Sequence, residues 1–447
     1  MSTRPIDPVD TIWLNMDRPD NLMVIEGVMT TDEPLDLDRL KAVIQERVLD
    51  RFPVFSQRPV VSRLPLGLPH WEDDPHFDLD RHLRTGVLPA PGNDLALQDY
   101  VSGFFGDPLP RDRPLWEIHV LEGYGGGSAV YSRLHHSLAD GIALMQVLLS
   151  LTDDDPDGTR SGPPEPTRHE QHALIETTVH LLRTLANPVH SGGAALDVAS
   201  LAVRTTGVAA KLLMGRNPAS PFVGTPGTGK RAVWGVPAPL DEVKAVARRT
   251  GTTVNDVVVA ALAGALATYQ LQHGAESVDI PTMVPVNLRS PDEPLPPELG
   301  NRFALVLLSL PSGLGTPFER LAETSRRMSA IKHSPEAWLT FGMIRGIGRT
   351  GPQLERLLVD FFANKATGVT TNVPGPRTPR YLGGSRVTAV MGWAPESGHQ
   401  TLGTCICSYA GRLHVGFKVD TATITHPEDL VTAFDAELAA LRSLAVV

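Results

Sequence analysis

The stretch Tyr131-Ser-Arg-Leu-His-His-Ser-Leu-Ala-Asp-Gly141 decides how the rest of the chain is interpreted. Residues 129–134, which lead into it, have the length and alternation of a β-strand. Residues 142–151, which follow it, are apolar and contain neither Pro nor Gly, so they predict a buried helix with Asp140 as its N-cap. The two histidines therefore lie in a turn between a strand and a helix.

A histidine in such a turn can act as a general base. Backbone groups can hold its ring in one tautomer while the other nitrogen faces a cleft. We expect His136 to be this base and His135 to support it, although a His-His pair alone also fits a structural role. Asp140 can cap the helix or reach an arginine across the fold, and Gly141 removes a side chain that would crowd the turn.

Length and composition describe a globular protein of more than one core. A chain of 447 residues predicts two domains of about 200 residues each. The 39 prolines and 40 glycines predict many turns and at least one loose connection. A formal net charge of -10 argues against nucleic-acid binding, which needs a concentrated positive field.

Cysteine usage and hydropathy indicate the compartment. Cys405 and Cys407 lie two apart in a strand-like run, without the geometry for an easy mutual disulfide, which fits a reducing compartment. No apolar signal region is expected at the N-terminus, and the longest apolar run, 257–267, predicts a buried helix. We expect a cytoplasmic protein with peripheral contact to membrane or lipid inclusions. Histidines 70, 76 and 82 are spaced too loosely for a metal site and are expected on the solvated surface.

The pattern divides the chain into three parts. Residues 1–152 mix helix and strand signals as in an α/β sandwich. An acidic, proline-rich run opens a helical linker over 153–230, and a second α/β domain follows over 231–447. The expected strands are 22–29, 280–286, 303–310, 368–373, 403–408 and 413–419. The expected helices are 37–49, 94–105, 240–249, 254–270 and 427–444.

Basic residues concentrate late in the linker. Between 177 and 230 a single acid, Asp197, stands against five basic residues, Arg183, Arg204, Lys211, Arg216 and Lys230. This stretch fits contact with an anionic lipid surface, and it fits equally well a helix that packs across both domains.

The HHxxxDG pattern at His135, His136, Asp140 and Gly141 resembles the CoA-dependent acyltransferase superfamily, which includes condensation domains and chloramphenicol acetyltransferase. Further motifs are similar to the bacterial wax ester synthase/diacylglycerol acyltransferase family, in family order from residue 7 to residue 413. These motifs are Pro114-Leu115-Trp116, Asn255-Asp256, Val286-Asn-Leu-Arg289, Gly300-Asn301-Arg302 and Thr371-Asn-Val-Pro-Gly-Pro376.

The resemblance implies two chloramphenicol-acetyltransferase-like α/β sandwich domains that meet at a channel. Acyl-CoA, a co-substrate, would enter from one side and an alcohol from the other, without a metal or a further cofactor. His136 would take the proton of the acceptor hydroxyl as it attacks the thioester, and would then protonate the CoA thiolate. The absence of a Gly-x-Ser-x-Gly motif agrees with a route that needs no acyl-enzyme.

The resemblance also assigns supporting roles. Asn255 would donate to the oxyanion or hold the start of its helix. Asp140 and Arg289 would form an ion pair that fixes the His136 turn. Residues 114–116 would shape the channel. The segment 22–26 departs from the family pattern, which leaves the details of the acyl or alcohol site open.

The leading hypothesis is an O-acyltransferase that makes triacylglycerol, wax esters or both. One alternative is a transferase of the same fold that acts on a polyketide-derived or glycolipid hydroxyl. The other is a lipid-binding or droplet-coating relative without activity. The intact pair of histidines, Asp140 and Asn255 argue against the latter, because a binding protein has no need of a poised base.

Overall fold

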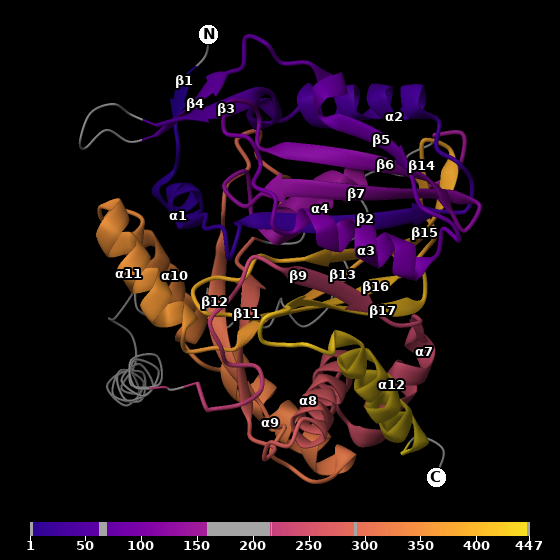
Figure 1. Ribbon diagram of the computed structural model, residues 1–447, viewed down its shortest axis with the longest axis vertical. Coiled ribbons are helices and arrows are strands. Elements are labelled where there is room, and N and C mark those ends of the chain that lie inside the picture. Colours follow the sequence, from indigo (N-terminus) through magenta and orange to yellow (C-terminus); the bar gives the residue numbers. More distant parts are fainter. Residues whose placement is uncertain (1–2, 62–68, 159–214, 216, 290–292, 445–447) are drawn as a thin grey trace, which may run out of the picture.

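Two large mixed β-sheets, with helices packed on them, form the body of the molecule (Figure 1). The computed structural model describes residues 3–61, 69–158, 215, 217–289 and 293–444. The first sheet lies in the upper half of Figure 1 and the second in the lower half. A small third sheet beside the N-terminus joins β1 (Thr3–Pro5), β4 (His70–Asp73) and β3 (Gln57–Val60).

The first sheet is built around the antiparallel pairs β6/β7 and β7/β2. Its strand order is β5 (Leu83–Val87), β6 (Trp116–Tyr124), β7 (Gly127–His135), β2 (Val24–Thr31), β15 (Ser385–Trp393), β14 (Tyr381–Leu382) and β8 (Thr152–Asp153). Its helices are α2 (Leu37–Ile44), extended by a π-helical turn (Gln45–Leu49), α3 (Asp94–Phe104) and α4 (Gly141–Ser150).

The second sheet has parallel pairs at its centre, where β13 lies between β11 and β16. Its order is β10 (Ala238–Pro239), β17 (Arg412–Asp420), β16 (Leu402–Tyr409), β13 (Gly368–Pro374), β11 (Ile280–Asn287) and β12 (Phe303–Leu310), with β9 (Lys230–Trp234) paired to β17. The helices below it in Figure 1 are α7 (Leu240–Thr250), α8 (Val254–Gln272), α9 (Pro317–Lys332) and α12 (Pro427–Ser443).

Helix α8 is the core helix of the second half. It alone among the described residues is long and apolar enough to cross a membrane, yet 78% of its most apolar window is buried inside the protein. Its neighbour α12 packs along it, and both belong to one hydrophobic cluster. The expectation of a buried helix at 257–267 is therefore confirmed.

Three further helices lie on the same flank of the molecule, at the left of Figure 1. They are α1 (Pro8–Met16), α10 (Glu336–Ile347) and α11 (Pro352–Ala363). Residues of all three share a small hydrophobic cluster that contains Ile12, Met16 and Ile347. None of the three was among the helices expected from the sequence.

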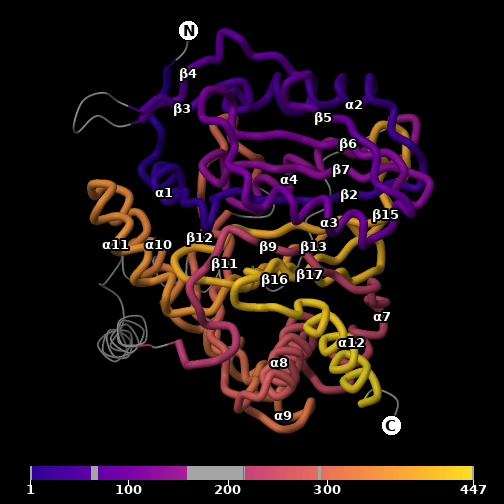
Figure 2. Tube along the Cα trace, in the orientation of Figure 1, coloured from indigo at the N-terminus to yellow at the C-terminus, as the bar shows by residue number. Residues whose placement is uncertain are grey.

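The mixed α/β, two-layered fold agrees with the sequence prediction, but the division of the chain does not follow the sheets. Strand β15, from the second half, pairs with β2 in the first sheet, where Val390 and Trp393 enter the core (Figures 1 and 2). Without β15, β2 would be an open edge, which proteins avoid. Strand β9 begins at Lys230, within the expected linker, and belongs to the second sheet.

The lipid-contact prediction for the linker falls largely outside the described residues, as do Arg183, Arg204, Lys211 and Arg216. Lys230 is described and does not belong to a surface patch. Its side chain is buried, and its Nζ atom lies 2.7 Å from the Asp420 carboxylate. This residue therefore holds β9 and β17 together.

A buried ionic cluster joins the two halves. Lys418 on β17 donates to Glu26 on β2 at 3.2 Å, and its Nζ atom lies 3.2 Å from a carboxylate oxygen of Glu396. Burial raises the pKa of Glu26, against the lowering effect of Lys418 and Arg133. Because unpaired buried charges are costly, these contacts fix how the two sheets meet.

Candidate active site

The two histidines lie where the sequence predicted, at the end of β7 and before α4. The backbone N–H of His135 donates to the Leu115 carbonyl at 3.0 Å, and that of His136 donates to the Met23 carbonyl at 2.8 Å. Asp140 caps α4 by accepting from the Ala143 N–H at 2.9 Å. Neighbouring strands and the helix cap therefore fix the turn from both ends.

The imidazole of His136 is buried between aromatic rings. It stacks on Trp13 with ring centroids 4.0 Å apart, and Phe303 lies 5.6 Å away. Burial lowers its pKa to about 4, although its own backbone, Asp140 and Asn301 act in the opposite direction. The ring is therefore neutral near pH 7.

The Nδ1 atom of His136 has no hydrogen-bond partner on any other residue that the structure describes. A proton on Nδ1 would leave the lone pair of Nε2 for a substrate. The expectation that backbone groups fix the tautomer of this ring needs correction, because Nδ1 has no hydrogen-bond partner among the described residues. Stacking on Trp13 and packing against the tilted ring of Phe303 hold the imidazole instead.

His135 points into the fold, as expected, and is 1% exposed. Its Nδ1 atom accepts from the Ser137 N–H at 3.1 Å, so the ring proton lies on Nε2, which donates to Asp17 at 3.2 Å. Burial works against ionisation of Asp17, but the hydrogen bonds from His135 and from the Met23 N–H outweigh it and lower the pKa of the carboxyl to about 2.

One face of α1 holds the histidine turn. Asp10, Trp13 and, just past the helix end, Asp17 are spaced three and four residues apart, so they share a side. Asp10 accepts from the Asn301 backbone at 3.1 Å and its side-chain amide at 2.8 Å. The same amide donates to the His136 carbonyl at 2.8 Å.

Asp10, Trp13, Asp17 and Asn301 were not among the site residues expected from the sequence. Asn301 was present only as part of a family motif, and Asp10 lies near the start of the region that resembles the family. The i, i+3, i+7 spacing of Asp10, Trp13 and Asp17 was the signal available in the sequence. The residues that this face of α1 contacts lie more than a hundred positions away in the chain. Burial raises the pKa of Asp10 to about 7, so its protonation changes close to neutral pH.

Asp140 and Arg289 form a buried ion pair and act on the same segment. The nearest atoms of the pair, Arg289 Nη2 and Asp140 Oδ2, are 4.0 Å apart. Arg289 donates to the carbonyls of Leu299 and Gly300 at 3.1 and 2.6 Å, while Asp140 accepts from the Arg302 N–H at 3.0 Å. The expected ion pair is therefore present, and both side chains also clamp residues 299–302 against the turn.

Gly141 does not have the role expected from its position. A Cβ atom there would meet Ile25 at 3.9 Å, which is ordinary van der Waals contact. The crowding argument is therefore wrong for the described surroundings.

Asn255 and Asp256 separate into two roles. Thr253 and Asp256 form the capping box of α8, so Asp256 holds the helix start. Asn255 instead accepts from the Asn372 amide on β13 at 2.6 Å. The helix-start alternative for Asn255 is thus replaced by a contact with β13, and the oxyanion role stays a prediction.

Residues 114–116 support the histidine turn from the start of β6. The Leu115 carbonyl accepts from His135, and Trp116 is buried with its indole N–H on the Phe55 carbonyl at 2.8 Å. His82 stacks on Trp116 at 4.5 Å and is itself buried, which corrects the expectation that it is solvated. None of residues 114–116 is among the described residues that line the cavity beside the site, so a channel-shaping role has no support here.

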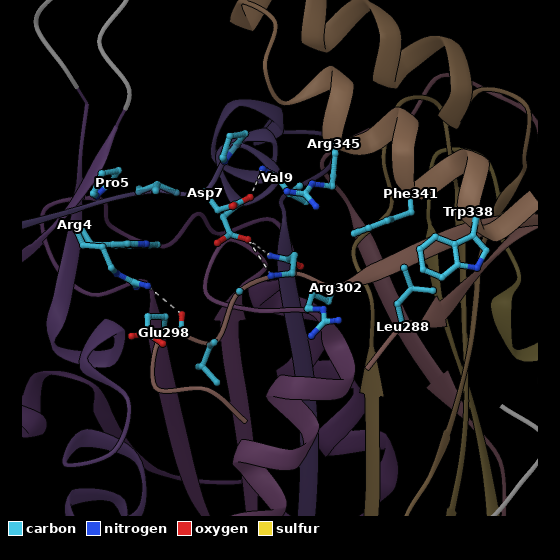
Figure 3. A pocket seen from close by; sticks show the side chains of 17 residues that line it. Arg4, Pro5, Asp7, Val9, Leu288, Glu298, Arg302, Trp338, Phe341 and Arg345 are labelled. Atoms are coloured by element: carbon cyan, nitrogen blue, oxygen red, sulfur yellow. Dashed lines mark hydrogen bonds between the residues drawn. The ribbon is translucent and has the colours of Figure 1, made fainter. Parts of the chain in front are cut away.

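A cavity of about 790 Å³ lies beside the residues that hold the histidine turn (Figure 3). Asp10 and Asn301 form part of its wall, so it reaches the residues that hold His136, although His136 does not line it. In Figure 3, Leu288, Trp338 and Phe341 form an apolar side, and Arg4 lies at the opposite side. Within the described residues, no group of three His, Cys, Asp or Glu side chains could hold a metal ion.

Comparisons with known proteins agree along the whole chain. The model of the wax ester synthase/diacylglycerol acyltransferase catalytic domain matches residues 6–258, and that of the family's C-terminal domain matches residues 299–442. A putative diacylglycerol O-acyltransferase of Mycobacterium tuberculosis is 30% identical over 99% of this chain and 98% of its own. The O-acyltransferase WSD of Acinetobacter baylyi is 26% identical over 97% and 96%.

Solved structures show the same fold. The wax ester synthase/diacylglycerol acyltransferase of Marinobacter aquaeolei VT8 superposes with a TM-score of 0.70 at 23% identity, covering 99% of this chain and 100% of that one. The first condensation domain of the calcium-dependent antibiotic synthetase, in complex with a substrate analogue, has a TM-score of 0.62 at 17% identity, over 99% and 96%.

Proposed function

The chain belongs to the wax ester synthase/diacylglycerol acyltransferase family, and we propose that it moves a fatty acyl group from acyl-CoA to the hydroxyl of diacylglycerol or a long-chain alcohol. The products are triacylglycerol or wax ester, together with free CoA. Acyl-CoA is a co-substrate, and the reaction needs no further cofactor.

In the proposed reaction, Nε2 of His136 takes the proton of the acceptor hydroxyl while the hydroxyl oxygen attacks the carbonyl carbon of the thioester. The carbon–sulfur bond then breaks, and the imidazolium returns the proton to the CoA thiolate. The new ester bond and the free thiol balance the reaction, and His136 ends neutral. General-base catalysis of this kind contributes about 10²–10⁴-fold to a rate.

The observation that carries the proposal is a neutral, buried His136 whose environment is assembled from both halves of the chain. Trp13 and Phe303 cover its ring, and Asn301 holds its carbonyl. A base must be unprotonated to act, and burial keeps the pKa of His136 below the physiological range. His135 contributes by fixing the turn through Asp17.

The test is acyl transfer from palmitoyl-CoA to diacylglycerol and to hexadecanol, measured side by side for His136→Ala and wild type. We expect the variant to lose about 10²-fold or more in turnover while staying folded. His414→Ala is a matched control, because His414 is also buried with a pKa lowered by burial to about 4, but lies on β17. Wild-type turnover in a folded His136→Ala variant would refute the role of the base.

The same assay decides between acceptor classes. Activity with a polyketide-derived or glycolipid hydroxyl, and none with diacylglycerol or hexadecanol, would favour the specialised acceptor. Absence of transfer to any acceptor by folded wild type would favour a lipid-binding relative.

A further inference from the structure

Helix α11 presents an apolar face to the outside. Leu354, Leu357 and Phe361 are 49%, 67% and 41% exposed. Their spacing of three and four residues places them on one side of the helix. An exposed apolar stripe of this kind costs solubility and usually marks a contact with a partner or a lipid surface.

The opposite side of α11 is firmly attached to the body of the protein. Val359 and Phe362 pack in the cluster with Ile12 of α1. Arg356 donates to the Asn15 carbonyl at 2.8 Å, and Asp360 accepts from Arg18. The helix is therefore held in one orientation, with its stripe turned away from the core.

The turn from α10 to α11 is anchored in the same way. A Cβ atom on Gly348 would lie 2.3 Å from the Pro8 carbonyl oxygen, so this glycine allows the chain to touch the start of α1. The two helices thus form a fixed hairpin, residues 336–365, beside the helix that holds the histidine turn (Figure 1).

The charge of the hairpin is basic where it meets solvent. Its basic residues are Arg345, Arg349, Arg356 and Lys365, of which the first three are exposed. Its acids are turned inward or neutralised: Glu336 and Glu355 are buried, and Asp360 pairs with Arg18. This surface stands out in a chain whose net charge is -10.

The hairpin also forms one wall of the cavity. Trp338, Phe341 and Arg345 of α10 line it. Trp338 and Phe341 lie on the side opposite Arg4 in Figure 3. A lipid surface in contact with the hairpin would therefore lie near a cavity whose wall includes Asp10 and Asn301.

We propose that the α10–α11 hairpin docks the enzyme on an anionic lipid surface, with Leu354, Leu357 and Phe361 among the acyl chains and the basic residues at the headgroups. The cavity beside it would receive the water-insoluble acceptor, and this part rests on the proposed function. The docking site lies on a segment different from the basic stretch 183–230.

The binding test is co-sedimentation of the full chain with vesicles of phosphatidylcholine containing about one third phosphatidylglycerol, an anionic lipid. We expect Leu354→Ser/Leu357→Ser/Phe361→Ser to weaken partitioning roughly tenfold or more, because three apolar side chains no longer enter the lipid. The control is Leu271→Ser/Phe318→Ser, which removes two residues that are 63% and 59% exposed on α8 and α9. The control should bind as wild type does.

Equal binding by wild type and the triple variant would overturn the proposal, and so would an equal loss in the control. If the triple variant fails to fold, Leu357→Ser alone, at the most exposed position of the stripe, should still weaken binding measurably. Arg349→Gln/Lys365→Gln should weaken binding to anionic vesicles and reduce its dependence on salt, with little effect on neutral vesicles. Unchanged binding to anionic vesicles would contradict the electrostatic part.

Activity separates this inference from the proposed function. The triple variant should keep wild-type turnover of a short, water-soluble alcohol and lose turnover of diacylglycerol presented in vesicles. Equal losses on both acceptors would refute a docking role. If wild type transfers acyl groups to neither acceptor but still binds vesicles through the stripe, the proposed function fails while the docking surface stands.

Discussion

Replacing Trp13 with alanine is expected to move the acid limb of the pH–rate profile to higher pH. Trp13 covers one face of the His136 ring at 4.0 Å, and burial is the main cause of the ring's lowered pKa. Without the indole, water reaches the imidazole and stabilises its protonated form. The base is then protonated, and inactive, over a wider pH range.

The structure sets the size of the effect. The pKa of His136 is about 4, against an ordinary value of 6.5. At pH 5 a group with the lower pKa is about nine-tenths neutral, whereas one with the ordinary value is only about 3% neutral. A return of the pKa from about 4 to 6.5 would make protonation of the ring more favourable by about 3.4 kcal/mol, at 1.36 kcal/mol per pKa unit. This is an upper limit for Trp13→Ala, because Phe303 also covers the ring.

The assay is kcat/KM for acyl transfer to a soluble alcohol between pH 4 and pH 8, for wild type, Trp13→Ala and Trp13→Phe. Wild type should be nearly flat down to about pH 5, and Trp13→Ala should fall steeply as the pH drops below about 6. Trp13→Phe keeps an aromatic face on the ring and should resemble wild type. An acid limb at the same pH in all three proteins would show that Trp13 does not protect the neutral base.

Four other substitutions test the surroundings of the site. Asp140→Ala and Arg289→Ala should each impair turnover, and the double variant should be little worse than either, because both side chains clamp residues 299–302. Strictly additive losses in kcat/KM would contradict this coupling. Asp17→Asn should lower the free energy of unfolding in urea by about 2 kcal/mol at pH 7, because the folded protein lowers the pKa of this carboxyl to about 2. This stabilisation is present above the unfolded pKa of 3.8 and is lost as the pH falls toward 2. A difference in stability between variant and wild type that is the same at pH 2 as at pH 7 would refute it. Lys418→Met should cost about 3–5 kcal/mol, because it leaves Glu26 and Glu396 buried without their cation; a chemical-denaturation curve like that of wild type would show that the ionic cluster contributes nothing.

Local pattern was sufficient for the strand, turn and helix around His136. Alternation over residues 129–134 predicted β7, and the apolar run 142–151, which contains neither Pro nor Gly, predicted α4. Asp140 caps the helix as an N-cap side chain should. These features depend on residues within a few positions of one another, so a single sequence reveals them.

Long-range pairing was hidden from the sequence. Strand β15 has an irregular register against β2 between Val387 and Ala389, and this interruption weakens its alternation. Which sheet it joins is decided by β2, more than three hundred residues away. His82 shows the same limit, since its polar neighbours indicated a surface while Trp116, on another strand, covers it.

The site is therefore a property of the whole chain and not of the segment that carries its histidines. Helix α1 supplies Asp10 and Trp13, the strand-to-helix turn supplies His136, and the segment before β12 supplies Asn301. These three segments come together only when the two sheets meet, and the buried Lys418 between Glu26 and Glu396 fixes that meeting. Since the second face of α1 holds the α10–α11 hairpin, one short helix connects the proposed base to the proposed lipid surface. The sequence motif marks the reacting group, and the contacts of α1 explain why the group is buried, neutral and close to the cavity.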